Sequence, residues 1–332
     1  MKDKMDVTVI VPVYNGKSTI RMCLDSLINQ SANNFMVFCI DDGSTDGSLS
    51  ILDEYSHKYS NVQVFSKANG GLSSARNYGL DYVETPYVMF VDCDDYVDCN
   101  FVKRMYEEIE KTKADIVSCG VVRETVNGNI LELFGCQTEQ LIEVEKDPDI
   151  ICKMDVVAWN KIYRKTLFDS VRFPNGYVFE DSMTTPRLVA RSNRVGFVSD
   201  ILYHYVMWDG SITRSQDKHL NDRKEICNVL FKDFYRNRYR EQYDYLIFSQ
   251  LFSYISVLFE EKSYSIAREE TQKMLDMYDN PSVWKNPCFQ RLQNGYSFWG
   301  ELWILLIEKH AWLLLRILQC GRNLKNFTFR KK

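Results

Sequence analysis

The sequence predicts an α/β fold, with a mainly parallel sheet flanked by helices and a helical C-terminal extension. Short apolar runs alternate with segments of helical periodicity through about residue 122. Such alternation is typical of parallel sheets covered by helices on both faces. Polar motifs follow the apolar runs, at the strand ends where ligands bind in such sheets. Beyond residue 215 the pattern is helical and rich in aromatics, so we expect an α/β domain at 1–215 and a helical region at 216–332.

The individual elements follow from these two periodicities. We expect strands at residues 7–13, 35–40, 62–65, 87–91 and 116–122. Between them we expect a helix that begins after Ser18, its predicted N-cap, and helices at 48–55, 72–82 and 102–111. The segment 124–199 is less regular, with one further helix expected at 182–190.

Composition excludes some classes of protein. The 332 residues carry a net charge of −4, which argues against a dedicated nucleic-acid binder. The ten cysteines are scattered without a CxxC pair, and "MKDKMDVTVIVPVYNG" has no apolar stretch long enough for a signal peptide. We therefore expect reduced cysteines and a cytoplasmic location.

A dense acidic cluster follows the fourth predicted strand, in "MFVDCDDYVD". Asp92 and Asp94 form a D-x-D that places two carboxylates on one side of an extended segment. Mg²⁺ and Mn²⁺ prefer such carboxylates together with substrate phosphates. The pattern therefore predicts a divalent cation that carries a diphosphate. An exposed acidic turn that caps the next helix is the alternative.

Two further motifs follow strands at the same predicted edge. "DDGSTDGS" places Asp41 and Asp42 where a carboxylate can accept hydrogen bonds from a nucleobase or a ribose. "NGGLSSARNYGL" begins a helix with small residues and places Arg76 one turn after the helix start. This pattern allows a phosphate or ribose to approach the helix closely. A capped turn and a surface arginine are the structural alternatives. Each motif is weak alone, and their shared edge is what strengthens them.

Four motifs in this order resemble family 2 glycosyltransferases with the GT-A fold: "TVIVPVYNG", "DDGSTDGS", "KANGGLSSARNYGL" and "MFVDCDDYVD". The similarity is specific over residues 6–100 and looser to about residue 215. It implies an inverting transfer of a sugar from a nucleotide diphosphate donor, with UDP favoured. The expected acceptor is a hydroxyl of a saccharide or lipid-linked saccharide, as in surface polysaccharide synthesis.

The resemblance also implies a donor site. Tyr14 in "PVYNG" matches the aromatic residue that stacks on the base, and Pro12 lies beside it. Asp42 matches the carboxylate that binds uracil, and Asp41 lies beside it. Arg76 matches a basic residue near the nucleotide. Asp94 is the expected direct ligand of Mn²⁺ or Mg²⁺, and Asp92 the ligand of the ribose or of a metal-bound water.

The acidic pair in "FEDS" resembles the family's pair at the acceptor site. Inverting displacement needs a carboxylate that takes the acceptor proton opposite the leaving diphosphate. We assign Asp181 as this base and Glu180 as a group that positions the acceptor. An acid that starts the helix at 182–190 is the alternative, and it is compatible with catalysis.

Other residues carry more open expectations. GT-A enzymes often use a late histidine, so His204 in "LYHYVMWDGSITRS" is a candidate metal or diphosphate ligand. A half-buried strand histidine is the alternative. Related sequences often carry a basic residue where Met207 or Trp208 stands, so Arg214 is a substitute contact. In "WNK", Trp159 suits either a sugar platform or the core.

The tail from Leu302 has two apolar blocks split by "EKH", followed by basic residues and no acid after Glu308. This pattern suits a helix that lies on an anionic membrane surface, which would place the protein at the inner face of the membrane. Packing on the catalytic domain or in a homodimer is the alternative.

Two rival functions differ from sugar transfer. A sugar-nucleotide nucleotidyltransferase would have a glycine-rich basic loop after the first strand, which "PVYNG" lacks. A non-catalytic nucleotide-sugar-binding module would not need both a D-x-D and a separate E-D pair.

Overall fold

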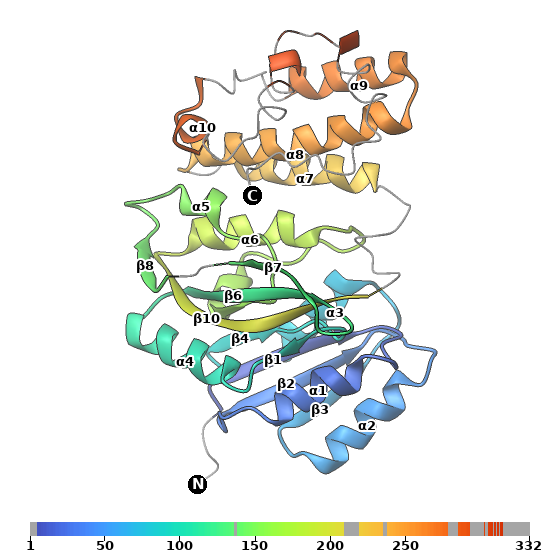
Figure 1. The fold of residues 1–332 in the computed structure, drawn as a ribbon, viewed down its shortest axis with the longest axis vertical. Coiled ribbons are helices and arrows are strands. Elements are labelled where there is room, and N and C mark those ends of the chain that lie inside the picture. The colour runs from blue at the N-terminus through green and yellow to red at the C-terminus, as the bar shows by residue number, and fades with distance from the viewer. Residues whose placement is uncertain are drawn as a thin grey trace. The chain divides into compact units, whose positions relative to one another are not determined.

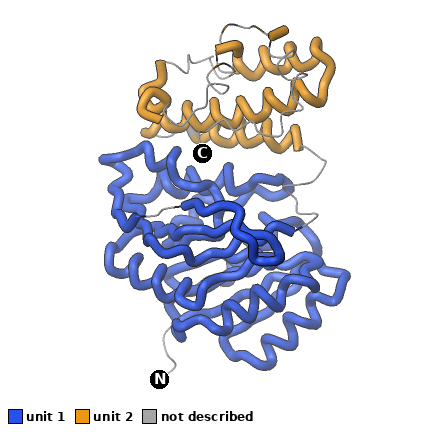
Figure 2. Tube along the Cα trace, viewed as in Figure 1, with its two compact units in different colours: residues 1–215 blue, residues 216–332 orange. Residues whose placement is uncertain are grey.

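The structure, a computed structural model, describes residues 5–135, 138–208, 219–234, 238–277 and 285–292, together with residues 302, 305–307, 309, 311, 313 and 314. The chain forms two compact units, residues 1–215 and 216–332 (Figure 2).

The first unit is built on one mixed sheet (Figure 1). Its main path runs β3-β2-β1-β4-β9-β6-β10-β5, with β7 paired to β6 and β8 to β10. The strands that the structure describes are β1 (Val7–Val13), β2 (Phe35–Asp41), β3 (Val62–Ser66), β4 (Tyr87–Phe90), β5 (Tyr96–Val97), β6 (Ile116–Thr125), β7 (Ile130–Phe134), β8 (Gln140–Glu143), β9 (Lys161–Arg164) and β10 (Arg194–Met207).

The α/β fold that the sequence predicts is confirmed, with additions. β1 pairs in parallel with β2 and β4, and β2 with β3, as the alternation implies. β9 then enters the middle of the sheet antiparallel to β4 and β6, while β5, β7 and β8 add antiparallel edges. These strands come from short or irregular segments, which carry little periodicity.

The predicted helices of the first unit begin and end close to the expected residues. They are α1 (Ile20–Ile28), α2 (Ser48–Lys58), α3 (Leu72–Tyr82), α4 (Phe101–Thr112) and α6 (Glu180–Arg191). The sequence did not predict the short helix α5 (Ile150–Lys153) or the 3-10 helix η1 (Lys165–Asp169). The predicted N-cap Ser18 is wrong by one residue, because α1 has Thr19 at this position. Thr19 donates its hydroxyl to the Gly16 carbonyl and thereby closes the turn before the helix.

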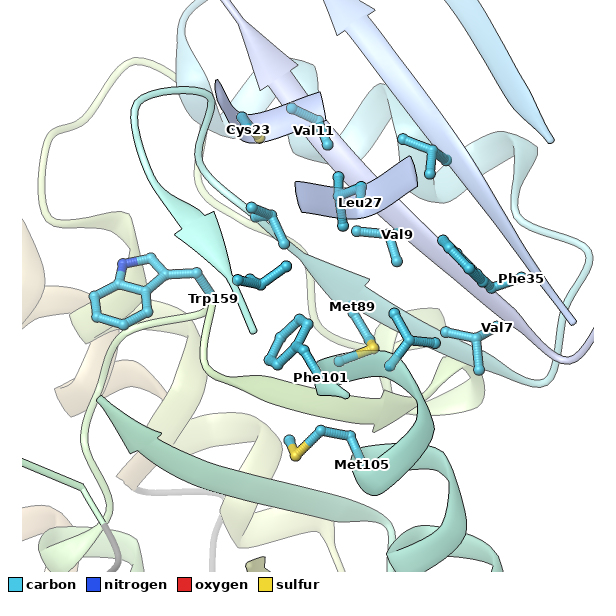
Figure 3. Close-up of a cluster of buried hydrophobic side chains, with 14 of the residues drawn as sticks. Val7, Val9, Val11, Cys23, Leu27, Phe35, Met89, Phe101, Met105 and Trp159 are labelled. Carbon is cyan, nitrogen blue, oxygen red and sulfur yellow. The ribbon is translucent and has the colours of Figure 1, made fainter. Parts of the chain in front are cut away.

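One face of the sheet carries a large apolar core (Figure 3). Val7, Val9 and Val11 of β1 point to this face because alternate strand residues share a side. Cys23 and Leu27 of α1 pack against them, and Phe101 and Met105 of α4 extend the cluster. The core fixes β1 and β4, whose C-terminal ends carry the predicted donor motifs.

The opposite face of β1 receives α3 at close range. Ile10 points to this face, and a Cβ atom added at Gly79 of α3 would lie 2.9 Å from the Ile10 Cγ2. Only glycine allows this approach. The contact sets the position of α3 and therefore of Arg76, one turn before Gly79.

The second unit contains α7 (Leu220–Phe234), α8 (Arg240–Glu261), α9 (Tyr264–Met277) and α10 (Pro287–Leu292). Its apolar core includes Ile226, Leu251, Phe259 and Phe289. Within the described part of the chain, no helix is long and apolar enough to cross a membrane. Most of the predicted membrane-binding tail, and Arg214, lie outside the described residues.

Candidate active site

The loops after β1 and β2 are joined by a network of hydrogen bonds. The Asn15 amide oxygen accepts from the Thr45 backbone N–H at 2.8 Å, and the Asn15 backbone N–H donates to the Ser44 hydroxyl at 3.0 Å. Asn15 adopts a left-handed φ of 52°, which asparagine tolerates better than most residues. This hydrogen-bond network leaves Tyr14 54% exposed at the end of β1, where a planar base could stack on it.

Both predicted base-binding carboxylates are buried and hydrogen bonded. Asp42 accepts hydrogen bonds from the backbone N–H groups of Gly70 and Gly71 and from the Lys67 ammonium at 2.5 Å. Asp41 accepts from the Ser66 hydroxyl at 3.0 Å. Asp42 thus clamps the loop between β3 and α3. Pro12 is buried within β1.

Sequence reasoning missed Lys67, the cation of this clamp. Lys67 directly follows β3, so its position at the shared strand edge is a signal that was available. Its ammonium also donates to the Ala68 carbonyl at 2.7 Å, which fixes the first turn of the loop.

Arg76 is the centre of the site. Its side chain is 1% exposed, and its guanidinium binds three carboxylates at once. One terminal nitrogen donates to Glu180 Oε1 at 2.5 Å and Asp181 Oδ1 at 3.0 Å, and the other donates to Asp92 Oδ1 at 2.8 Å. Arg76 therefore joins the D-x-D to the acidic pair, two motifs separated by nearly ninety residues.

The acidic pair opens α6. Phe179 precedes it with a left-handed φ of 64°, a rare conformation for a large residue. Glu180 and Asp181 occupy the first helical turn, where the helix dipole favours negative charge. Asp181 Oδ2 also accepts from the Ala158 backbone N–H at 3.2 Å, so both carboxylate oxygens are oriented.

The local electrostatics suit Asp181 to proton transfer near neutral pH. Burial raises the pKa of Asp181 to about 7, with Glu180 and Asp92 acting in the same direction and Arg76 opposing them. A carboxyl group with such a pKa can exchange a proton with a substrate hydroxyl at physiological pH. The role of Asp181 as the base stays a prediction.

The Asp94 carboxylate fits an incoming cation. Its side chain makes no ion pair with any described residue, whereas Asp92 pairs with Arg76. Burial, with Asp92 as the next cause, raises the pKa of Asp94 to about 6. A largely buried carboxylate without a cationic partner is costly, and a divalent ion would remove that cost.

The third acid of the cluster has a structural role that the sequence did not reveal. Asp95 is 1% exposed and accepts from the Tyr203 hydroxyl at 2.8 Å and from the Val206 backbone N–H at 2.9 Å. It therefore fastens the D-x-D segment to β10. Burial raises its pKa well above the usual value.

The structure does not gather His204 with Asp92 and Asp94. His204 lies opposite Tyr96 of β5, and the two rings stack at 4.2 Å. Its Nδ1 lies 3.3 Å from Glu124 Oε1. Within the described ranges, no three His, Cys, Asp or Glu side chains form a group that could hold a metal ion. A metal at Asp94 would therefore need oxygen ligands from elsewhere, such as donor phosphates.

The "WNK" motif supports the site from within the core. Trp159 is 5% exposed and stacks on Tyr203 at 4.2 Å, which favours its core interpretation. Lys161 is fully buried and donates to the Val157 carbonyl and to Asn160 Oδ1. Burial lowers the pKa of Lys161 to about 8. These bonds fix the loop whose Ala158 N–H orients Asp181.

Comparison with known proteins agrees with this arrangement. The model of "Glycosyl transferase family 2" matches residues 8–171, which include the strand-end motifs and "WNK". The uncharacterized glycosyltransferase EpsJ of Bacillus subtilis is 30% identical over 247 residues, which cover 69% of this chain and 70% of EpsJ. The chain belongs to glycosyl transferase family 2.

Two further proteins resemble this chain, one in sequence and one in fold. Glycosyltransferase GlyA of Streptococcus pneumoniae is 33% identical over 226 residues, which cover 63% of this chain but only 31% of GlyA. The fold resembles that of TarS 1–349 of S. aureus in complex with UDP-GlcNAc. That match has a TM-score of 0.71 at 20% identity and covers 97% of this chain and 93% of TarS 1–349.

Proposed function

We propose that this family 2 glycosyltransferase moves a sugar from a nucleotide diphosphate donor to a hydroxyl of a saccharide or lipid-linked saccharide, with inversion. The observation that carries the proposal is the link through Arg76. It joins Asp92, on the predicted donor side, to Asp181, the predicted base. UDP is the favoured nucleotide, because the structurally similar TarS 1–349 is named with UDP-GlcNAc.

The residues have separate tasks in this reaction. Tyr14 stacks on the base, and Asp41 and Asp42 shape its pocket. Asp181 takes the acceptor proton while Glu180 positions the acceptor. Arg76 holds Asp181 in place and disperses the charge of the acidic pair.

Asp94, with a free oxygen of Asp92, would hold Mn²⁺ or Mg²⁺. The ion neutralises the leaving diphosphate when it is bound. Asp94 and the donor phosphates then supply oxygen ligands of the kind that hard divalent cations prefer.

The proposed setting is surface polysaccharide synthesis in the cytoplasm, with peripheral contact to the inner face of the membrane. A lipid-linked acceptor fits the basic, tryptophan-containing tail that the sequence shows. The rival nucleotidyltransferase and binding-module functions gain no support from the strand-end geometry. A binding module would not need a base with a raised pKa beside the D-x-D.

The test is release of UDP from a panel of UDP-sugars in the presence of Mn²⁺. We expect Asp94→Asn to abolish release without unfolding the protein, and excess chelator to abolish it in the wild type. Asp169→Asn, a matched change at a residue with 58% side-chain exposure, should retain activity. Full activity of Asp94→Asn, or full activity in chelator, would contradict the metal assignment.

A further inference from the structure

A pocket of about 320 Å³ lies beside the D-x-D, between α1, β5 and the ends of β6 and β10. Its lining includes Met22, Tyr96, Glu124, Val126, Val206 and Trp208. We name it the Glu124 pocket. Trp208 connects it to the D-x-D, because the indole N–H donates to the Asp94 main-chain carbonyl at 2.8 Å.

The polar centre of the pocket is a fixed carboxylate. Glu124 is 6% exposed, and its Oε1 accepts from the Tyr96 hydroxyl at 2.5 Å and lies 3.3 Å from His204 Nδ1. Its Oε2 accepts no hydrogen bond from the described residues. A buried carboxylate with one oxygen held and the other available is a directional acceptor for a ligand hydroxyl.

The rest of the lining is aromatic and apolar. Tyr96 and Trp208 supply flat surfaces, and Met22, Val126 and Val206 supply apolar contact. The stack on His204 covers one face of the Tyr96 ring and holds it in place. Aromatic rings beside a single oriented polar group suit a ligand with apolar C–H faces and hydroxyl edges.

The described lining offers no cation to a donor diphosphate. No lysine, arginine or histidine is among the described residues that line the pocket, so a diphosphate would meet the Glu124 charge without compensation. The side chains predicted to bind the donor do not line it either: Pro12, Tyr14, Asp41, Asp42, Arg76 and Asp92. A neutral sugar ring fits the remaining chemistry.

We infer that the Glu124 pocket binds a neutral hexose ring of the acceptor saccharide, with a ring hydroxyl donating to Glu124 Oε2 and the ring packed on Trp208. The acceptor role rests on the proposed sugar transfer. The affinity of the pocket for a sugar is a separate property that can be measured without the donor.

The first experiment uses saturation-transfer NMR on the full chain. The probes are methyl β-D-glucopyranoside, methyl β-D-galactopyranoside and methyl N-acetyl-β-D-glucosaminide. We expect the wild type to bind at least one, and Glu124→Gln to weaken that binding about tenfold, since it loses a charge-assisted bond. Glu132→Gln, the matched change on β7 outside the pocket lining, should bind like the wild type.

A second variant separates folding from binding. Trp208→Phe offers the sugar ring a smaller aromatic surface and removes the N–H to Asp94, so we expect weaker glycoside binding in a protein that still unfolds in one cooperative thermal transition. If none of the three glycosides binds, or if all variants bind equally, the inference is overturned.

Competition and donor hydrolysis distinguish this inference from the proposed function. UDP should not displace the glycoside, and displacement by a UDP-sugar but not by UDP would assign the pocket to the donor sugar and overturn the acceptor role. Release of UDP from the donor by the wild type, measured in the absence of acceptor, tests the proposed transfer separately from glycoside binding. If glycoside binding depends on Glu124 but no UDP is released from any donor, the proposed transfer is contradicted and the inference of a sugar site in the Glu124 pocket is retained.

Discussion

At the scale of single residues, Arg76 supplies positive charge to Asp92 of the D-x-D and to both acids of the E-D pair. The sequence places Arg76 on a helix with small residues, where it looks like a phosphate ligand. The structure shows a buried guanidinium shared among Asp92, Glu180 and Asp181. Carboxylates so close together repel, and the shared cation is what makes the cluster tolerable.

Arg76→Ala should therefore destabilise the protein by about 3–5 kcal/mol, because it leaves buried carboxylates uncompensated. Without the cation, the folded-state pKa of Asp181, already raised by burial, rises further above its unfolded value. The folded state then binds more protons than the unfolded state, so stability falls as pH rises from 5 to 8, more steeply than in the wild type. Urea unfolding at several pH values measures this slope.

Arg104→Ala is a suitable comparison for that measurement. Arg104 binds Asp200 and Glu139 at the surface, with 32% of its side chain exposed. Exposed pairs contribute little, so we expect a loss below about 1 kcal/mol. Equal losses for both arginines would contradict the view that the Arg76 cluster depends on burial.

Asp181→Asn should lower turnover at least about a hundredfold and leave donor affinity nearly intact, as loss of a general base does. A base works only when ionised, and the pKa of Asp181 is raised to about 7. The wild-type rate should thus rise with pH, reach half of its maximum near pH 7 and level off about one pH unit higher. Calorimetry of donor binding beside a pH–rate profile checks both points, and an equal loss of donor affinity would place Asp181 in the nucleotide site.

At the scale of elements, the sequence predicted most of the strands and helices around β1. It predicted few of the antiparallel strands that later segments add to the sheet. Val7–Val13 reads as a strand because a compact apolar run is buried on both faces. β9 (Lys161–Arg164) carries no such run, and only its partners β4 and β6 make it a strand. The sequence predicted functional roles for the D-x-D and for the acidic pair. It did not predict that Arg76 links them, because that link depends on tertiary contacts.

The packing of α3 on β1 gives a prediction at this scale. Gly79→Ala would bring a Cβ to 2.9 Å from Cγ2 of the fully buried Ile10. Ile10 cannot relieve this clash by rotating about χ1, because a β-branched side chain has few χ1 rotamers available. We expect a loss of about 1–3 kcal/mol in the free energy of unfolding, with reduced activity because α3 carries Arg76. Denaturant unfolding of the variant measures it.

Ile10→Ala provides the matching double-mutant cycle. Each single variant should be destabilised, but the pair should be less destabilised than the sum, since the truncated side chain makes room for the new methyl group. Additive losses would show that Gly79 is needed for another reason, such as its own backbone freedom.

At the scale of the whole molecule, the sequence-predicted membrane tail divides into two parts. Leu306 and Ile307 of the first apolar block are buried, at 8% and 1% exposure. Leu313 and Leu314 of the second block are exposed, at 61% and 53%. Leu306 and Ile307 are therefore packed, whereas Leu305 of the same block is 42% exposed, and the second block with the basic residues that follow it carries the membrane prediction.

Replacing both Leu313 and Leu314 with glutamine should thus weaken binding to anionic liposomes, because these side chains would supply the insertion energy. The basic residues Arg316, Arg322, Lys325, Arg330, Lys331 and Lys332 add roughly 1 kcal/mol for each charge held near the surface, a contribution that salt screens. Co-sedimentation should fall in the double variant and, for the wild type, as salt rises. Ile266→Gln, at an exposed α9 position, should bind as the wild type does. Equal binding by the double variant would contradict the membrane role of these leucines, and salt-independent binding would contradict the role of the basic residues.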